Sequence, residues 1–317
     1  MQIIVVRLLA VCSMVLMGVL ARRRGLLDSA GTRQISHLVT NILYPAAIYG
    51  TLVQTFTLPG LAANWTLPAG TIMTMAVGFA IGLLAALVVP FTGLRERRAF
   101  HFQCTINNYV FLALPLVQIY WGSQGVALLI FSTVGSEIAV WTLGVMALTG
   151  QRLDARALRH LLSMPMAAIL AAVATLALAE VCAWRPAAGG LIEDLRAALL
   201  AAVDMVGKGT VPLAMVVAGS RMAELRPQHL WRWPQVALVG LRLVVIPGAV
   251  LALLHLLPFA PEARQVLTVV AVMPSAVASV MLSDIYQADS DFAAAAVLLT
   301  HLGALITIPL WLGLVLV

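Results

Sequence analysis

Two stretches of this sequence place prolines beside amide or hydroxyl side chains within long apolar runs. The residues concerned are Asn107, Asn108 and Pro115 in the first stretch and Pro274, Ser275 and Ser279 in the second. Proline removes a backbone hydrogen bond, and the neighbouring amides and hydroxyls can satisfy the freed backbone groups or bind a ligand. Aligned N–H groups at a helix N-terminus favour negative charge, so the pattern predicts an anion-binding site. The structural alternative is a pair of kinked helices.

Ionisable residues also occur inside the apolar runs. Asp204 and Lys208, the only lysine, are four residues apart and therefore share a helical face on which they can pair. Such groups usually face a bundle interior or a polar path. Lys208 could attract an anion or replace a coupling cation and Asp204 could titrate, or the pair only fixes helix packing. Glu137 and Arg242 are candidates for a relay or an internal counterion.

The composition places these residues in a membrane. The chain is 62% hydrophobic and 10% charged, with a mean hydropathy of +1.00, which is far too apolar for a soluble domain. A transmembrane helix needs about 20 mostly apolar residues, and long runs rich in Leu, Ala and Val favour helices over the alternating strands of a β-barrel. The expected spans cover residues 3–21, 34–56, 67–90, 99–120, 123–149, 160–182, 194–218, 234–257, 264–286 and 291–316.

The spacing of prolines indicates an internal repeat. Four prolines of the first half recur in the second after 166 to 168 residues. These pairs are Pro45 and Pro212, Pro59 and Pro227, Pro68 and Pro234, and Pro90 and Pro258. The repeat matches the second span to the seventh, pairing Asn41 with Lys208, and the broken fourth span to the broken ninth. Residues 1–150 and 151–317 are thus predicted to be two five-helix repeats, inverted because five is odd.

The distribution of basic residues predicts the orientation. Thirteen of the 19 Lys and Arg residues lie in the connections after the first, third, fifth and seventh spans. Because cytoplasmic loops are enriched in Lys and Arg, both termini are expected outside the cytoplasm of a multi-pass inner-membrane protein. The same argument explains the net charge of +6 without a nucleic-acid partner.

Motifs of enzymes are missing from the sequence. It contains no HExxH, no Gly-x-Ser-x-Gly, no Asp-rich cluster and no nucleotide-binding loop. Cys12, Cys104 and Cys182 have no metal-ligand or redox spacing. We therefore expect no catalytic residue, metal or cofactor, although a membrane-embedded enzyme, a channel or a sensor remains an alternative.

Several short motifs resemble the auxin efflux carrier family, whose bacterial members include malonate and malate permeases. The motifs are Asn107-Asn108, Leu114-Pro115-Leu116, Ile119-Tyr120, Gly209 to Ala214 and Ala271 to Pro274. The resemblance implies an all-α membrane protein of ten transmembrane helices, built as two inverted five-helix repeats. In that fold, which is similar to bile acid sodium symporters, the broken helices 4 and 9 cross at the substrate site. Many bacterial relatives have glycines where this chain has Tyr109 and Phe111.

The resulting hypothesis is a secondary active transporter of small organic anions that works by alternating access. The amides of Asn107 and Asn108 and the half-helix N-termini would bind the anion. The expected partners are the anion, the lipid bilayer and a coupling proton or sodium ion, with a second copy of the chain as a further candidate. Mono- or dicarboxylates such as malonate and malate are the substrates that the resemblance implies.

Overall fold

The computed structural model describes residues 2–150, 163–181, 190–224 and 232–315. Within these ranges every regular element is a helix, and the one β-bridge joins two non-helical segments. Cys182 and several of the basic residues used for the orientation argument lie outside the described residues. They are Arg152, Arg156, Arg159, Arg185 and Arg226.

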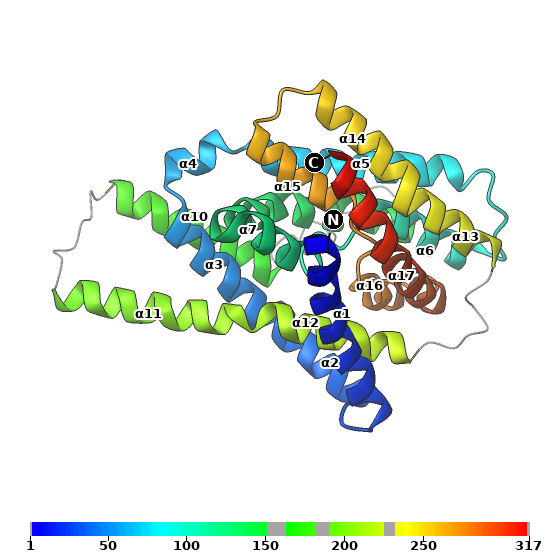
Figure 1. The fold of residues 1–317 in the computed structure, drawn as a ribbon, viewed down its shortest axis with the longest axis horizontal. Coiled ribbons are helices and arrows are strands. Elements are labelled where there is room, and N and C mark those ends of the chain that lie inside the picture. Colours follow the sequence, from blue (N-terminus) through cyan, green and yellow to red (C-terminus); the bar gives the residue numbers. More distant parts are fainter. Residues whose placement is uncertain (1, 151–162, 182–189, 225–231, 316–317) are drawn as a thin grey trace.

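The helices pack as two groups (Figure 1). In the first group, α1 packs along α12, and α3 packs against both α10 and α11. Its members are α1 (Gln2–Arg23), α2 (Ser29–Leu38), the π-helical turn η1 (Val39–Leu43), α3 (Tyr44–Thr55), α10 (Met164–Val181), α11 (Leu191–Lys208) and α12 (Thr210–Ala223).

The second group is built around α5, α7 and α17. A short helix, α4 (Leu58–Ala63), leads into it. Its members are α5 (Thr66–Ala85), α6 (Leu94–Thr105), α7 (Ala113–Ala139), η2 (Val140–Gly144), α8 (Val145–Thr149), α13 (Trp233–Gly240), η5 (Leu241–Val245), α14 (Ile246–Leu256), α15 (Pro261–Ala271), α16 (Ser279–Ile285) and α17 (Ser290–Val315). The two groups meet where α3 contacts α7 and where α12 contacts α17.

Six helices of the described residues are long and apolar enough to cross a membrane. They cover Leu58–Ala85, Ala113–Thr149, Met164–Val181, Leu191–Ala223, Trp233–Leu256 and Ser290–Val315. Three of the helices next to the breaks, α6, α15 and α16, are too short to span alone. The 12 residues of α6, for example, extend only about 18 Å across a hydrocarbon core of about 30 Å. Large apolar side chains such as Leu191, Leu199, Ile306 and Leu314 are exposed, which suits a lipid-facing surface. The chain is therefore a multi-pass, all-helical membrane protein.

The fourth and ninth predicted spans are interrupted. Residues 106–112 separate α6 from α7, and residues 272–278 separate α15 from α16. Pro274 lies inside its break, but Pro115 does not. Pro115 occupies the first turn of α7, where a missing N–H leaves no intrahelical bond unmade. The prediction that Pro115 interrupts the fourth span is therefore wrong, although the span is broken a few residues earlier.

Glycines set the close approach of helices within each group. A Cβ atom on Gly219 of α12 would lie 1.9 Å from the carbonyl oxygen of Val15 in α1, and one on Gly18 would lie 2.1 Å from that of Val216. Small residues at such positions let helix backbones touch, which replaces the missing hydrophobic drive inside a bilayer.

We predict that Gly219→Ala destabilises the protein by about 1–3 kcal/mol, because the added methyl group meets a backbone atom that cannot rotate away. The measurement is thermal unfolding of the purified protein in detergent. Gly313→Ala is the matched control, since a Cβ there meets nothing within 4 Å, and we expect its effect to stay within about 0.5 kcal/mol. Equal melting temperatures for the two variants would contradict this packing.

Candidate functional site

The two helix breaks are hydrogen-bonded to each other. Asn107 and Ser275 form an antiparallel β-bridge. The N–H of Asn108 donates to the carbonyl of Pro274 at 2.8 Å, and that of Ala276 donates to Ile106 at 3.4 Å. The two breaks, which are 166 residues apart in the sequence, thereby satisfy backbone groups that proline and the broken helices leave without partners. We call this pairing the crossing.

Two polar atoms at the crossing are buried without a partner. The side chains of Asn107 and Ser275 are almost fully buried. The Asn107 Nδ2 donates to the carbonyl of Val270, whereas neither Asn107 Oδ1 nor Ser275 Oγ bonds any atom that the structure describes. Because unsatisfied buried polar atoms are rare and costly, these two are candidates for contact with a ligand.

Asn108 is instead fully engaged within the protein. Its Oδ1 accepts from the N–H groups of Phe111 at 3.1 Å and Leu112 at 3.4 Å, ahead of α7. Its Nδ2 donates to Nε2 of His301 at 3.1 Å. The other ring nitrogen, Nδ1, then carries the hydrogen that binds the carbonyl of Val297 at 2.8 Å. In this conformation Asn108 braces the break, because it satisfies the backbone N–H groups of the two residues that precede α7.

Other polar residues hold the crossing against its neighbours. Gln103 donates from Nε2 to Ser279 Oγ at 2.7 Å and to the carbonyl of Ala293 at 3.3 Å. The N–H of Ser275 donates to Thr300 Oγ1 at 3.3 Å. Ser279 is thus bound to α6, the half-helix of the other break.

A cavity of about 170 Å³, the crossing cavity, lies between the crossing and the first helix group. Asn107, Asn108 and Tyr109 line it from one break and Ala276 from the other, while Thr40 faces it from η1. Most of the remaining lining is apolar. The crossing therefore forms one wall of a cavity that lies between the two helix groups.

The crossing cavity contains a buried carboxyl group. Glu137 on α7 is 5% exposed. Its Oε1 accepts from the Tyr109 hydroxyl at 3.0 Å, and its Oε2 accepts from Ser163 at 3.4 Å. No Lys, Arg or His within the described ranges forms an ion pair with it. A carboxyl group without a cationic partner at this depth is a candidate for carrying a proton.

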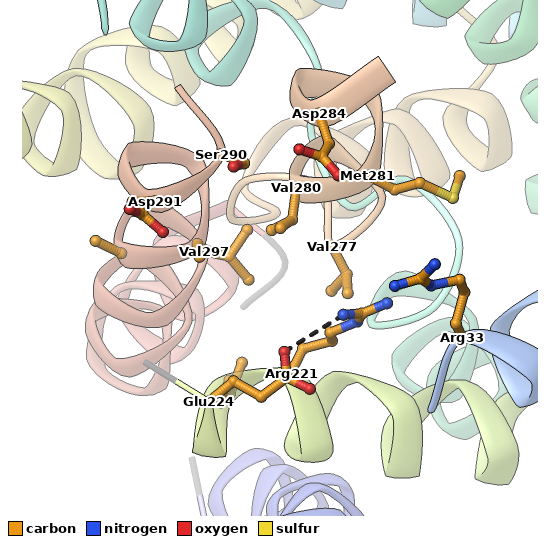
Figure 2. Close-up of a pocket in the computed structure, with 13 residues that line it drawn as sticks. Arg33, Arg221, Glu224, Val277, Val280, Met281, Asp284, Ser290, Asp291 and Val297 are labelled. Atoms are coloured by element: carbon orange, nitrogen blue, oxygen red, sulfur yellow. Dashed lines mark hydrogen bonds and ion pairs between the residues drawn. The ribbon is translucent and has the colours of Figure 1, made fainter. Parts of the chain in front are cut away.

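A larger cavity of about 640 Å³, the outer cavity, adjoins the crossing cavity. The two share Arg221, Val277, Val280 and Met281 as lining residues. Figure 2 shows the guanidinium groups of Arg33 and Arg221 pointing into the same part of the outer cavity, near Val277. Together the cavities form a path from one end of the helix bundle to the crossing.

Carboxylates accompany these arginines. Glu224 accepts from Arg221 Nη1 at 3.3 Å and pairs with Arg22 at 3.0 Å. Asp284 on α16 and Asp291 on α17 also line the outer cavity (Figure 2). The outer cavity is therefore charged with both signs, whereas Arg221 is the only basic residue among those that line the crossing cavity in the described part of the chain.

The sequence-predicted residues separate into two sets. Asn107, Asn108 and Glu137 line the crossing cavity, and Pro274, Ser275 and Ser279 lie in or beside the crossing but are buried outside both cavities. Pro115, Asn41, Asp204 and Lys208 line neither cavity.

Asp204 and Lys208 do pair, but on the outside of α11. Their side chains are 46% and 75% exposed and lie 2.6 Å apart. Asn41 is also exposed, and its amide donates to the carbonyl of His37 in its own helix at 2.9 Å. These groups face away from the path to the crossing.

Sequence reasoning missed Arg33, Arg221 and Tyr109 as site residues. Both arginines were explained by the rule that cytoplasmic loops are rich in Lys and Arg, so nothing indicated that they also line the outer cavity. Arg221 lies in the last turn of α12, which extends beyond the predicted seventh span of residues 194–218, so the sequence offered no signal to separate it from loop arginines. For Tyr109, its place next to Asn107-Asn108 was the available signal.

No metal site is evident in the ranges that the structure describes, since no three His, Cys, Asp or Glu side chains lie close enough to hold an ion.

A polar crossing enclosed by apolar helices, with a cavity leading to it, places the chain among membrane transport proteins. A family model described as membrane transport protein matches residues 3–169 and, a second time, residues 158–312. The chain belongs to this family, which is that of the auxin efflux carriers. The chain is also similar to an uncharacterized transporter of Methanocaldococcus jannaschii, with 22% identity over 308 residues that cover 96% of each chain. The family resemblance predicted from the motifs is confirmed.

Proposed function

We propose that this protein is a secondary active carrier that moves a small organic anion across the cytoplasmic membrane by alternating access. The observation that carries the proposal is a pair of unpartnered buried atoms at the crossing, Asn107 Oδ1 and Ser275 Oγ. Asn107 lines the inner end of a path that also bears arginine, and Ser275 is its partner in the β-bridge and adjoins Ala276, which lines the same cavity. A substrate hydroxyl or protonated carboxyl group would donate to Asn107, and the Ser275 hydroxyl would donate to a carboxylate oxygen.

The charges along the path favour an anion. Arg221 lines both cavities, so a carboxylate that enters the outer cavity remains near the same guanidinium as it reaches the crossing. Arginine binds carboxylates in two parallel hydrogen bonds, which suits this role. The small volume of the crossing cavity, about 170 Å³, suits a mono- or dicarboxylate of the size of malonate or malate.

We further propose ten spans in two inverted repeats, 1–150 and 151–317. The crossing of the two matched breaks supports this arrangement, because inverted repeats commonly place their broken helices at a shared site. The outer cavity lies at the end of the bundle that carries Arg33 and Arg221, which the positive-inside rule assigns to the cytoplasm. On this assignment the structure is open inward and both termini are outside.

Glu137 is the proposed coupling group. When the Glu137 carboxyl group is protonated, the residues that line the crossing cavity carry one positive charge, that of Arg221, which favours an anion. When Glu137 is ionised, its negative charge cancels that of Arg221. Tyr109 and Tyr44 face the same cavity and are neutral near pH 7. Anion and proton would therefore bind together and cross together.

We also propose that a second copy of the chain covers α11. An ion pair such as Asp204 and Lys208 is costly against lipid within an apolar span, and a symmetric contact would shield it. A monomer by light scattering in lipid nanodiscs would refute this.

The direct experiment is uptake of labelled malonate and malate into proteoliposomes, with proton and sodium gradients imposed separately. The proposal predicts saturable uptake and counterflow. Flux without counterflow indicates a channel, and hydrolysis without flux indicates a membrane-embedded enzyme; either result would remove the carrier assignment.

We predict that Asn107→Ala and Ser275→Ala lower kcat/KM for uptake by about tenfold or more, because each removes one hydrogen bond to a charged or polar substrate group. The Ser275 change should leave the melting temperature unchanged, since that hydroxyl has no partner among the described residues. Asn41→Ala and Ser283→Ala are the controls. Ser283 Oγ is likewise buried and unpartnered but lies within α16, outside the β-bridge of the crossing. Wild-type rates in both site variants would contradict the assignment.

We predict that Glu137→Gln reduces proton-driven accumulation by about tenfold or more while counterflow exchange continues, because glutamine keeps the hydrogen bonds but cannot release a proton. Accumulation and exchange are compared in the same vesicles at pH 6 and pH 8. Glu180→Gln, an exposed carboxyl group on α10, serves as the control. Undiminished accumulation in Glu137→Gln would exclude Glu137 as the proton carrier.

A further inference from the structure

Arg242 is a fully buried guanidinium at the crossing. It lies in the π-helical turn η5, is 1% exposed and is the largest fully buried side chain of the described residues. None of the ion pairs within the described ranges includes it. A charge at this depth without a carboxylate requires another source of compensation.

That compensation comes from three main-chain carbonyl groups. Arg242 donates from Nε to Met273 at 3.1 Å, from Nη1 to Cys104 at 3.1 Å and from Nη2 to Ala271 at 3.4 Å. Cys104 lies in the last turn of α6, and Ala271 is the last residue of α15. One side chain therefore binds the C-terminal ends of both half-helices that lead into the crossing.

The charges balance at this point. A helix C-terminus carries about half a negative charge on carbonyl groups that have no intrahelical partner. Two such ends supply about one negative charge, and one guanidinium offsets it. With no water in the hydrocarbon core, an uncompensated pair of carbonyl ends would be costly.

Neighbouring helices enclose the carbonyl groups that Arg242 binds. A Cβ atom on Gly78 of α5 would lie 2.3 Å from the Cys104 carbonyl oxygen, so that oxygen is covered on one side by the α5 backbone and bound on the other by Arg242. The π-helical turn that carries Arg242 is followed by Pro247, in the first turn of α14. Such turns often occur at functional sites because they redirect a side chain.

We propose that Arg242 is a tethered cation that fills the place between two half-helix ends where a transporter would otherwise bind a coupling alkali cation. Carbonyl groups at unwound and terminal helix positions are the ligands that bind sodium ions in secondary transporters. In this protein the Arg242 guanidinium, which is part of the chain, occupies the corresponding carbonyl groups. Sodium or potassium is therefore neither bound nor required at the crossing, and coupling through this position is closed. The inference about coupling rests on the proposed carrier function, but the cation position itself can be tested without transport.

The test uses thermal unfolding of purified protein in detergent, with Na⁺, methylguanidinium or choline added at equal ionic strength. Wild type should show no difference among the three cations. Arg242→Ala should melt at least about 5 °C lower, and Na⁺ or methylguanidinium, but not choline, should restore part of the loss with saturation. If Arg242→Ala does not fold, Arg242→Gln, which keeps two donors without the charge, is titrated in the same way.

Arg264→Ala is the matched control, since Arg264 also donates to one backbone carbonyl, that of Phe259 at 3.4 Å, but lies at the start of α15. It should show no cation-dependent shift. Saturable stabilisation of wild type by Na⁺, or an Arg242 variant without any cation response, would overturn the inference. In proteoliposomes, replacing Na⁺ by choline should leave wild-type uptake unchanged. Sodium-dependent uptake would overturn the proposal that Arg242 replaces a coupling cation, but not the proposed carrier function. Absent uptake together with the expected cation response in thermal unfolding would overturn the carrier function, but not the role of Arg242.

Discussion

Backbone hydrogen bonding at the crossing is the constraint on which the rest of this structure depends. Within a bilayer every N–H and C=O group needs a partner from the protein, yet two helices of this chain stop in the middle of the bundle. Each break is satisfied largely by the other, through the bonds from Asn108 to Pro274 and from Ala276 to Ile106. The two breaks therefore depend on each other for their backbone hydrogen bonds.

The same constraint explains why polar groups concentrate here. Once the helices are broken, the freed backbone groups need partners. Asn108 provides them for the two residues ahead of α7, and Arg242 provides them at the C-terminal ends of α6 and α15. The backbone is thereby satisfied by fixed protein groups, and only Asn107 Oδ1 and Ser275 Oγ remain for a substrate at the bridge itself. Close packing through Gly18 and Gly219 joins α1 and α12 in the first helix group, and the crossing cavity lies between this group and the crossing.

Local features of this fold could be predicted from the sequence. Apolar run length identified a helical membrane protein. Pro274 beside Ser275 located the second break, and the adjacent amides Asn107 and Asn108 located the first. The pairing of the breaks across 166 residues could not be predicted from local pattern and came only from the repeat and the family resemblance. Pro115 was misplaced because a proline within a helix and one in its first turn look alike in sequence.

Side-chain direction was the harder part of the site. Asp204 and Lys208 have the spacing of a functional pair, but spacing fixes only their shared helical face, and that face points outward. Arg221 and Arg33 were not recognised as site residues, since a basic residue near a span end fits the positive-inside rule whether or not it also lines a cavity. Ten spans and their inversion remain predictions.

Alternating exposure of the crossing is the central claim, and cysteine accessibility measures it directly. Ala278 is the last residue of the ninth-span break and lines the crossing cavity, so Ala278→Cys is placed in a chain whose three native cysteines are replaced. An impermeant thiol reagent is then added to either face of oriented vesicles. The account predicts modification from both faces, with a ratio that shifts when a transported anion is present. Modification from one face only, unchanged by any substrate, would contradict it.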